Sequence, residues 1–376
     1  MPDQPTSAAD LSASVQRLAS VAAQYAAESD AQRALPDPVV EALLDAGFAG
    51  HFVPGCWGGA DGTVLELLHS VAAVAEGCTS AAWSASVLAG TGRLGAYLPE
   101  QGQRELWAKG ADTPLAGALI PRGSATEVSD GWRVTGQWDF TSAVNFSAWA
   151  LVCALLPQEG GGAQPWFFAL PRADYQVADT WTSTGMRGTG SNTLVVNNVF
   201  VPRHRGFARD AMVAGRSVGS DARCHTAPLR LLSGVLFGAP ALGAARAALR
   251  LRSAEQPPDT TDARGASARI GLARAAGTID AAGLLLERAA RVADAPSASA
   301  LAQARNPADC AHAVAQLVDS VEGLVRVAGS SAFLEAHPLQ RVWRDIHSMA
   351  SHVALRFDQA GDAYGARLVE AAVGTV

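Results

Sequence analysis

The spacing of apolar residues changes twice along the chain, and this limits its fold more than any other feature. From about residue 8 to 115, apolar side chains recur at helical spacing, as at Leu11, Val15, Leu18 and Val21. From about 116 to 212, short apolar stretches alternate with turn residues, and helical spacing returns from about 225. We therefore expect an N-terminal all-α domain over residues 1–115, a central antiparallel β domain over 116–215 and a C-terminal four-helix bundle over 216–376.

Local signals place elements within these three zones. Asp37 followed by Pro38 predicts a helix start, and Gly47 predicts the end of the same helix. Further helices are expected over residues 63–76, following Thr63, and near 79–95. The stretches GWRVTGQWDF, WALVCALL, WFFAL and NTLVVNNVFV predict strands. In the last zone four long amphipathic segments are expected over residues 234–255, 267–295, 308–329 and 339–371, with breaks at 255–266 and 294–300.

Composition excludes several classes of protein. The net charge is −6 and no run of Lys or Arg occurs, so we expect neither a nucleic-acid partner nor binding to an anionic membrane. No uncharged apolar run reaches the ~18 residues of a spanning helix. The first thirty residues carry acids and lack a secretory pattern, which favours a cytoplasmic location. The five cysteines have no CxxC spacing, so neither a disulfide framework nor a metal site is expected.

Three segments carry more specific information. They read GWRVTGQWDFTSAVNFSAWALV, TWTSTGMRGTGSNTLVVNNVFVP and HPLQRVWRDIHSMASHVAL, in this order. Together they resemble the acyl-CoA dehydrogenase superfamily and its two-component flavin-dependent monooxygenase branch, which includes phenol hydroxylases and dibenzothiophene monooxygenases. The resemblance covers residues 12–370. It implies the three-part fold given above and a homotetramer.

The residues that follow Arg344-Asp345, the RD motif of the third segment, indicate which branch of the superfamily the chain resembles. A dehydrogenase needs a carboxylate base beside the flavin, and no Glu occurs between Glu335 and Glu370. His352 stands seven residues after Asp345, as in the monooxygenase branch. A base on an earlier helix would have to be Glu255, which lies in a predicted linker. The second histidine that many monooxygenases of this branch carry around residues 85–97 is missing.

Spacing within the last segment adds a second argument. Arg341, Asp345, Ser348 and His352 are separated by four, three and four residues, so a helix would align them in one polar stripe suited to line a pocket. The alternative is a solvated face with a surface pair between Arg341 and Asp345.

The resemblance implies a monooxygenase that takes reduced flavin, FADH2 or FMNH2, from a separate NAD(P)H:flavin reductase. The flavin would react with O2 to give the C4a-hydroperoxide, which would oxygenate a small aromatic or heteroatom-containing substrate. The chain has no dinucleotide fingerprint of its own, which agrees with a separate reductase. Ser142 is expected near flavin N5. His352, with a pKa near the operating pH, is expected to take a substrate proton or to steer the terminal oxygen.

The same resemblance implies the residues that bind flavin. Leu119, Ile120, Gly123 and Ser124 would meet the ring edge and pyrophosphate. Trp138, Phe140, Thr141 and Ser142 would flank the ring. The flavin phosphate would be reached by Arg344, by the turn at Gly329 and Ser330, and by either Arg264 or Arg269.

Two alternatives stay open at this point. One is an FAD-dependent acyl-CoA dehydrogenase or oxidase that acts on an acyl thioester. The other is a catalytically inactive homologue that serves as a binding or scaffold protein.

Overall fold

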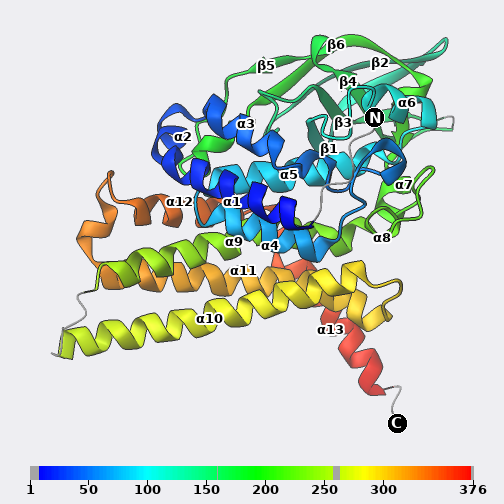
Figure 1. The fold of residues 1–376 in the computed structure, drawn as a ribbon. Helices are drawn as coiled ribbons and strands as arrows, with labels where there is room; N and C mark the ends of the chain where they lie inside the picture. The colour runs from blue at the N-terminus through cyan, green and yellow to red at the C-terminus, as the bar shows by residue number, and fades with distance from the viewer. Residues whose placement is uncertain (1–7, 159, 257–262, 374–376) are drawn as a thin grey trace.

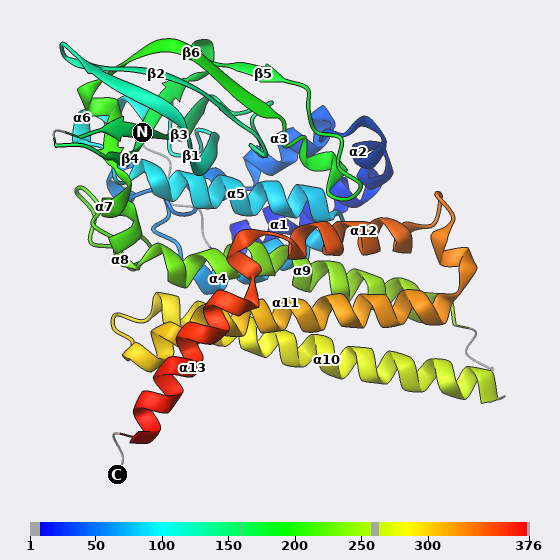
Figure 2. The same cartoon turned by 180° about the vertical axis from the view of Figure 1, so that it is seen from behind.

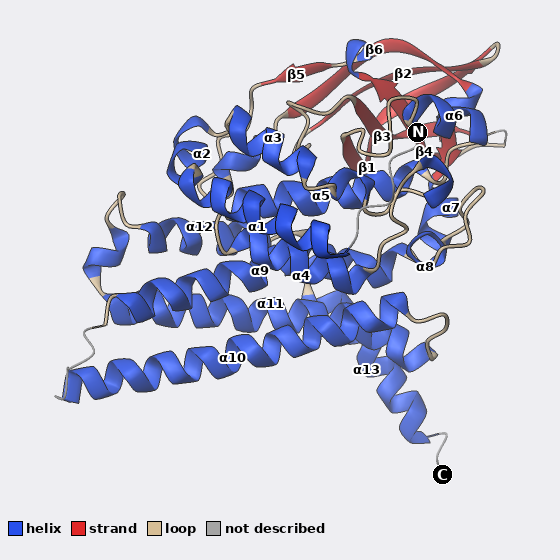
Figure 3. Cartoon of the chain, in the orientation of Figure 1, coloured by secondary structure: helices blue, strands red, loops and turns tan. Residues whose placement is uncertain are grey.

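The computed structural model describes residues 8–158, 160–256 and 263–373, and it arranges them in three layers (Figure 1). A sheet forms one side, short helices from the N-terminal part lie in the middle, and long helices form the other side. Figure 3 shows that the strands are confined to the first layer. The first layer and the helical layers follow the three zones of periodicity in the sequence.

The N-terminal helices begin and end where local signals place them. Thr63 caps α4, and its side chain and that of Glu66 form a reciprocal capping box. Gly47 adopts a left-handed φ of 75° just after α3. The elements are α1 (Ala8–Gln24), α2 (Ala26–Gln32), α3 (Asp37–Asp45), η1 (Phe48–Gly50), η2 (Gly55–Trp57), α4 (Val64–Ala75), α5 (Thr79–Gly95) and α6 (Glu100–Leu106).

The sheet has the strand order β5-β6-β2-β1-β3-β4-β7. Its strands are β1 (Leu115–Val128), β2 (Gly131–Trp138), β3 (Trp149–Pro157), β4 (Ala163–Pro171), β5 (Gln176–Ala178), β6 (Thr193–Pro202) and β7 (Gly206–Ala208), with short 3-10 turns η3 (Arg172–Asp174), η4 (Arg187–Thr189) and η5 (Arg203–Arg205). The sheet is mostly antiparallel, as expected, and β1 departs from this by pairing with β3 in parallel. The chain can make this pairing because β2 runs antiparallel to β1, so β2 and the loop after it return the chain to the end of the sheet where β1 begins.

The long helices follow α7 (Arg209–Ala214) and α8 (Arg223–Thr226). They are α9 (Leu229–Ala254), α10 (Ala263–Asp294) and α11 (Ala300–Ala328), followed by η6 (Ser330–Phe333), α12 (Pro338–Ala350), η7 (Val353–Leu355) and α13 (Phe357–Val373). The prediction of one long fourth helix was wrong. Figure 2 shows α12 running beside α9, and α13 crossing α11 in another direction. The chain turns between them at His352, whose ψ of 138° is extended rather than helical.

The largest hydrophobic core joins the N-terminal helices to the C-terminal ones. Leu67, Leu68 and Val71 of α4 and Leu88 of α5 share this cluster with Leu242 and other residues of α9. α9 has the length and apolar composition of a membrane-spanning helix, yet 83% of its most apolar window is buried in the protein. Its apolar character is therefore accounted for by packing on all sides.

Candidate active site

The two residues expected to be catalytic meet through a tryptophan that the sequence did not single out. Trp83 of α5 donates its indole N–H to Ser142 Oγ at 3.0 Å. The same indole ring meets the His352 ring edge-on, with centroids 5.7 Å apart. Ser142 follows β2 and His352 follows α12, so Trp83 links the end of the sheet to the end of the bundle.

His352 lies in an aromatic group formed by three separate elements. Phe237 of α9 lies against the imidazole at a centroid distance of 3.7 Å, and the ring of Trp83 lies 5.0 Å from that of Phe237. This burial lowers the pKa of His352 to about 4. The expected pKa near the operating pH was therefore wrong, since an imidazole in this apolar setting stays neutral at pH 7.

The tautomer of His352 follows from its backbone contact. The N–H of Ala354 donates to His352 Nδ1 at 3.2 Å, so Nδ1 carries no proton. In the neutral ring the proton must then be on Nε2. His352 is thus arranged to donate a hydrogen bond rather than to act as a strong base.

The polar stripe expected on the last helix does not exist in that form. α12 ends at Ala350, so His352 does not continue the helical face. Asp345 is buried and its Oδ1 accepts from the N–H of Met186 at 2.6 Å. Burial raises the pKa of Asp345 to about 6. The alternative of a solvated Arg341–Asp345 pair is equally wrong, because the carboxylate points into the protein against the turn that holds Met186.

The RD motif holds the GMRGTGS turn in place. A side chain at Gly185 would have its Cβ 2.1 Å from the carbonyl oxygen of Arg344, so the turn can approach α12 only with glycine there. Arg344 is paired with Asp30 at 2.9 Å and also donates to Thr184 O. Arg187 donates to the carbonyl of Asp30. These contacts occupy the Arg344 guanidinium, and its expected role toward a flavin phosphate stays a prediction.

The hydroxyl of Ser142 continues into a buried row of hydroxyls. Its Oγ lies 2.7 Å from Ser191 Oγ, which lies 2.7 Å from Thr189 Oγ1. Thr189 Oγ1 donates to the carbonyl of Met186 at 2.9 Å. Sequence reasoning missed Trp83, Phe237 and Ser191. For Ser191 a signal existed, since it ends the GMRGTGS motif, whereas nothing local marks Trp83 or Phe237.

Two apolar residues expected to bind flavin are exposed to solvent. Phe140 is 69% exposed and Ile120 is 57% exposed. Phe140 has a left-handed φ of 60°, and its ring meets that of Trp181 edge-on at 5.9 Å. Arg122 of β1 forms an ion pair with Asp139, the residue that follows β2. Large exposed aromatic and aliphatic side chains next to a buried hydroxyl acceptor suit a flat heteroaromatic ring with one polar edge.

Most of the other residues expected to contact flavin are buried or half-buried. Trp138 is buried and donates to the carbonyl of Cys153 at 2.7 Å, and its ring fills the space that a side chain at Gly123 would need. Thr141 Oγ1 donates to the carbonyl of Trp138. The half-buried Leu119 packs against the core, while Ser124 is exposed on β1. Their expected contacts with flavin stay predictions.

The other residues expected to reach the flavin phosphate lie on α10 and on the turn after α11. Gly329 and Ser330 form the exposed turn that ends α11. Arg269 is exposed on α10, and the side chain of Arg264 lies outside the part of the chain that the structure describes. Glu255, the carboxylate considered for a dehydrogenase, pairs with Arg252 and with His337 rather than with the group around His352.

Two further features lie away from this site. Asp61, Cys224 and His225 bring possible metal-ligand atoms within 4.8 Å of one another, but His225 uses Nε2 on the Phe52 carbonyl and Nδ1 on the Ser220 hydroxyl. These contacts account for the buried histidine without a metal. A cavity of about 330 Å³ lies between α9, α10 and α11, and neither Ser142 nor His352 lines it.

The chain is similar to known proteins over most of its length. The acyl-CoA dehydrogenase N-terminal domain family matches residues 7–109, and the acyl-CoA dehydrogenase C-terminal domain family matches residues 235–357. The oxygenase subunit HsaA of a flavin-dependent monooxygenase from Mycobacterium tuberculosis is 31% identical, over 86% of each chain. The oxygenase component of an FADH(2)-dependent resorcinol hydroxylase from Rhizobium is 28% identical, over 93% of this chain and 92% of that one.

A solved structure extends the similarity to the whole fold. The 3-HSA hydroxylase from Rhodococcus superposes with a TM-score of 0.90 at 26% identity, covering 96% of each chain. The monooxygenase interpretation is thereby confirmed over the dehydrogenase and scaffold alternatives. The chain belongs to the flavin-dependent monooxygenase branch of the acyl-CoA dehydrogenase family, as an oxygenase component that uses O2 and reduced flavin from a separate reductase.

Proposed function

We propose that this oxygenase hydroxylates a small planar aromatic substrate that carries a hydroxyl group, bound against Trp83, Phe237 and His352. The observation that carries the proposal is the aromatic group itself, in which a neutral imidazole presents Nε2–H beside two aromatic rings. Flat aromatic walls favour a flat substrate, and a single hydrogen-bond donor selects a substrate with an acceptor oxygen. The name of the resorcinol hydroxylase relative, which acts on such a compound, supports the same class.

The residues beside Ser142 fit the flavin that the family uses. Ile120 and Phe140 would cover the apolar face of the ring, and Ser142 would accept a hydrogen bond from its N5–H. Bound reduced flavin supplies the electrons that activate O2 for transfer of one oxygen atom to the substrate. The protein's own contribution is to hold the ring, to exclude water and to orient the substrate oxygen.

His352 would bind the substrate oxygen rather than remove its proton. Its pKa is lowered to about 4 by burial, so at neutral pH the ring is an uncharged donor. A hydrogen bond from Nε2 to a phenolic oxygen would place the aromatic carbons next to the flavin site. The same bond would favour the ionised form of the phenol, which reacts more readily with an electrophilic oxygen.

A reductase-coupled assay tests the proposal. The oxygenase is supplied with a flavin reductase, NAD(P)H and O2, and product is measured for phenols and for matched arenes in which hydrogen replaces the hydroxyl. We expect oxygenated product from phenols only. Product from the arenes at equal rates would refute the role given to the substrate oxygen.

Variants of His352 distinguish a role as hydrogen-bond donor from a role as general base. His352→Gln keeps an N–H donor, whereas His352→Ala removes it, so we expect KM for the phenol to rise at least about tenfold in the alanine variant and less in the glutamine variant. His347→Gln is the matched control, because His347 is exposed and lies 3.5 Å from Glu322 instead. Equal loss in both His352 variants with an acidic limb in the rate profile would favour a base instead.

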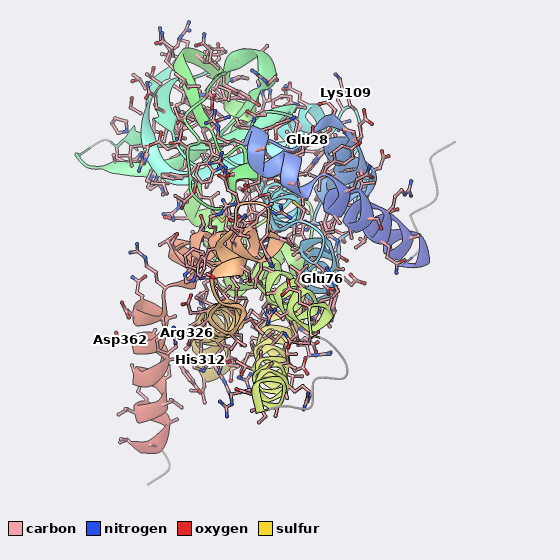
Figure 4. All side chains as sticks on the ribbon, turned by 90° about the vertical axis from the view of Figure 1, so that its left-hand side faces the viewer. Glu28, Glu76, Lys109, His312, Arg326 and Asp362 are labelled. Carbon is pink, nitrogen blue, oxygen red and sulfur yellow. The ribbon has the colours of Figure 1, made fainter. Side chains whose placement is uncertain are left out.

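We also propose a homotetramer, supported by α13. No side chain of α13 within residues 357–373 is buried, although Leu368 and Val369 are apolar. Figure 4 shows this helix, marked by Asp362, standing beside the bundle that carries His312 and Arg326. A second subunit would cover it. Light scattering on the purified protein tests this, and a monomer or a dimer would refute it. A cytoplasmic location is proposed from the five free thiols, which suit a reducing compartment.

A further inference from the structure

The hydrogen-bonded row that includes Ser142 has two ends of fixed character. At one end the indole N–H of Trp83 can only donate, and it does so to Ser142 Oγ at 3.0 Å. At the other end the carbonyl of Met186 can only accept, and it does so from Thr189 Oγ1 at 2.9 Å. Between these ends stand three hydroxyls, of Ser142, Ser191 and Thr189, each 2.7 Å from the next.

These ends fix the direction of every hydroxyl proton between them. Thr189 uses its one proton on Met186 O, so it must accept from Ser191. Ser191 then has no proton left for Ser142, so Ser142 must donate to Ser191. All three hydroxyls are buried, with exposed fractions of 7% for Ser142, 4% for Ser191 and 3% for Thr189, so water does not compete for these contacts.

We propose that Trp83, Ser191 and Thr189 are positioning residues that hold the Ser142 hydroxyl as a hydrogen-bond acceptor toward the flavin. A hydroxyl has one proton and two lone pairs. The Ser142 proton is committed to Ser191, and one lone pair is committed to Trp83. Only the second lone pair of Ser142 is left for a ligand. This inference rests on the proposed placement of flavin N5 at Ser142.

The consequence is discrimination between the two redox states of flavin. Reduced flavin carries a proton on N5 and can donate to the free lone pair of Ser142. Oxidised flavin has only a lone pair on N5, so the same geometry sets acceptor against acceptor. A serine that was free to rotate would donate to the oxidised ring and accept from the reduced one, and would not discriminate. The row therefore favours binding of the reduced form and release of the oxidised form.

The far end of the row is itself held in place. Met186 has a left-handed φ of 56°, and its N–H is fixed by the buried Asp345 at 2.6 Å. Its carbonyl also accepts from the indole of Trp181 at 3.0 Å. The Met186 carbonyl also accepts from the backbone N–H of Thr189 at 3.2 Å, so it cannot turn away from Thr189 without the loss of several hydrogen bonds.

Thr189→Val tests the proposal without touching the flavin. Valine has the shape of threonine but no hydroxyl, so Ser191 loses its acceptor and can turn its proton to Ser142, which frees the Ser142 proton for oxidised N5. The dissociation constants of FAD and FADH2, and of FMN and FMNH2, are measured anaerobically. We expect the ratio of the oxidised to the reduced constant to fall about tenfold. The midpoint potential of the bound flavin then falls by about 30 mV for the two-electron couple.

Two controls complete the experiment. Thr189→Ser keeps the hydroxyl and is expected to keep the wild-type ratio. Ser191→Ala removes the acceptor of the Ser142 proton directly and is expected to lower the ratio as Thr189→Val does, which covers the case in which the valine variant does not fold. An unchanged ratio in a folded Thr189→Val or Ser191→Ala variant overturns the proposal and leaves the monooxygenase function intact. Failure of the wild-type protein to bind either form of flavin would instead overturn the proposed flavin site.

Discussion

Replacing Asp345 by asparagine tests how the buried carboxylate contributes to stability. The asparagine side chain would keep an oxygen that can accept from the N–H of Met186, which Asp345 Oδ1 now does at 2.6 Å. The substitution removes only the charge that burial disfavours. Burial is the main cause that raises the pKa of Asp345 from 3.8 to about 6, against the opposing effect of the Met186 hydrogen bond.

The sign and size of the effect follow from this pKa. The folded carboxyl holds its proton more tightly than the unfolded one, so its contribution to stability is full below pH 3.8 and is lost as the pH rises through about 6. The difference between these two pKa values corresponds to about 3 kcal/mol, of which ~1.4 kcal/mol develops between pH 5 and pH 8. The free energy of unfolding of the wild type should therefore fall relative to that of Asp345→Asn over this interval.

Urea unfolding at pH 5 and pH 8, at one protein concentration, gives this quantity as a double difference. Any fixed cost of the new amide is the same at both pH values and cancels, as do the titrations of other groups. Asp362→Asn, on the exposed face of α13, is the matched control and should show no pH-dependent difference. Parallel curves for the wild type and Asp345→Asn would refute the claim that Asp345 is ionised at a cost in the folded protein.

Three further predictions concern particular contacts. Gly185→Ala should lower the free energy of unfolding by more than about 2 kcal/mol, because the new Cβ would lie 2.1 Å from Arg344 O. Gly277→Ala in α10, where the new Cβ would meet open space, should raise the free energy of unfolding by about 0.5–1 kcal/mol. Thermal melts of both variants check this. Thr63→Ala should cost about 1 kcal/mol through loss of the capping box, and Thr63→Ser should restore most of it in the same assay. A thiol reagent should label the exposed Cys56 rapidly in the native protein and all five cysteines only after unfolding. The reason is that burial raises the pKa of Cys78 and Cys153 to about 11 and that of Cys224 to about 12. Labelling of several thiols in the native state would contradict the buried positions.

Much of the fold was predictable because its signals are local. The Thr63 capping box and the left-handed Gly47 depend on residues a few positions apart, and both stand where the sequence places them. The central strands were likewise visible as short apolar stretches. β1 was not recognised, because Pro121 and Gly123 make its second half resemble a loop in the sequence, and its pairing is interrupted by a bulge between Ala118 and Gly123. The parallel pairing of β1 with β3 depends on the path of the chain between them, which no local pattern encodes.

Only two residues of the candidate site could be predicted from the sequence. Ser142 and His352 could be found from motifs, but the helical spacing around His352 was misleading because the helix ends two residues earlier. Trp83 and Phe237 sit in α5 and α9, whose apolar composition hides a residue that faces a site among residues that face the core. Their role appears only when the helices cross. The low pKa of His352 has the same origin, since it is a property of the neighbours that the fold supplies.

The buried Asp345 and the orientation of Ser142 are parts of one arrangement. A charge that costs about 3 kcal/mol at pH 8 is unfavourable for stability alone, and a neutral acceptor would serve Met186 as well. Yet Asp345 fixes Met186 in a left-handed conformation, Met186 O is the terminal acceptor for Thr189, and Thr189 sets the direction of Ser191 and Ser142. α12 and the turn after it thus reach the proposed flavin site twice, through His352 on the substrate side and through Asp345 on the Ser142 side. Asp345 is the destabilising group, and it holds Met186 at the fixed end of the row. The direction of the Ser142 hydroxyl therefore depends on the folded contact between α12 and Met186 and not on a single side chain.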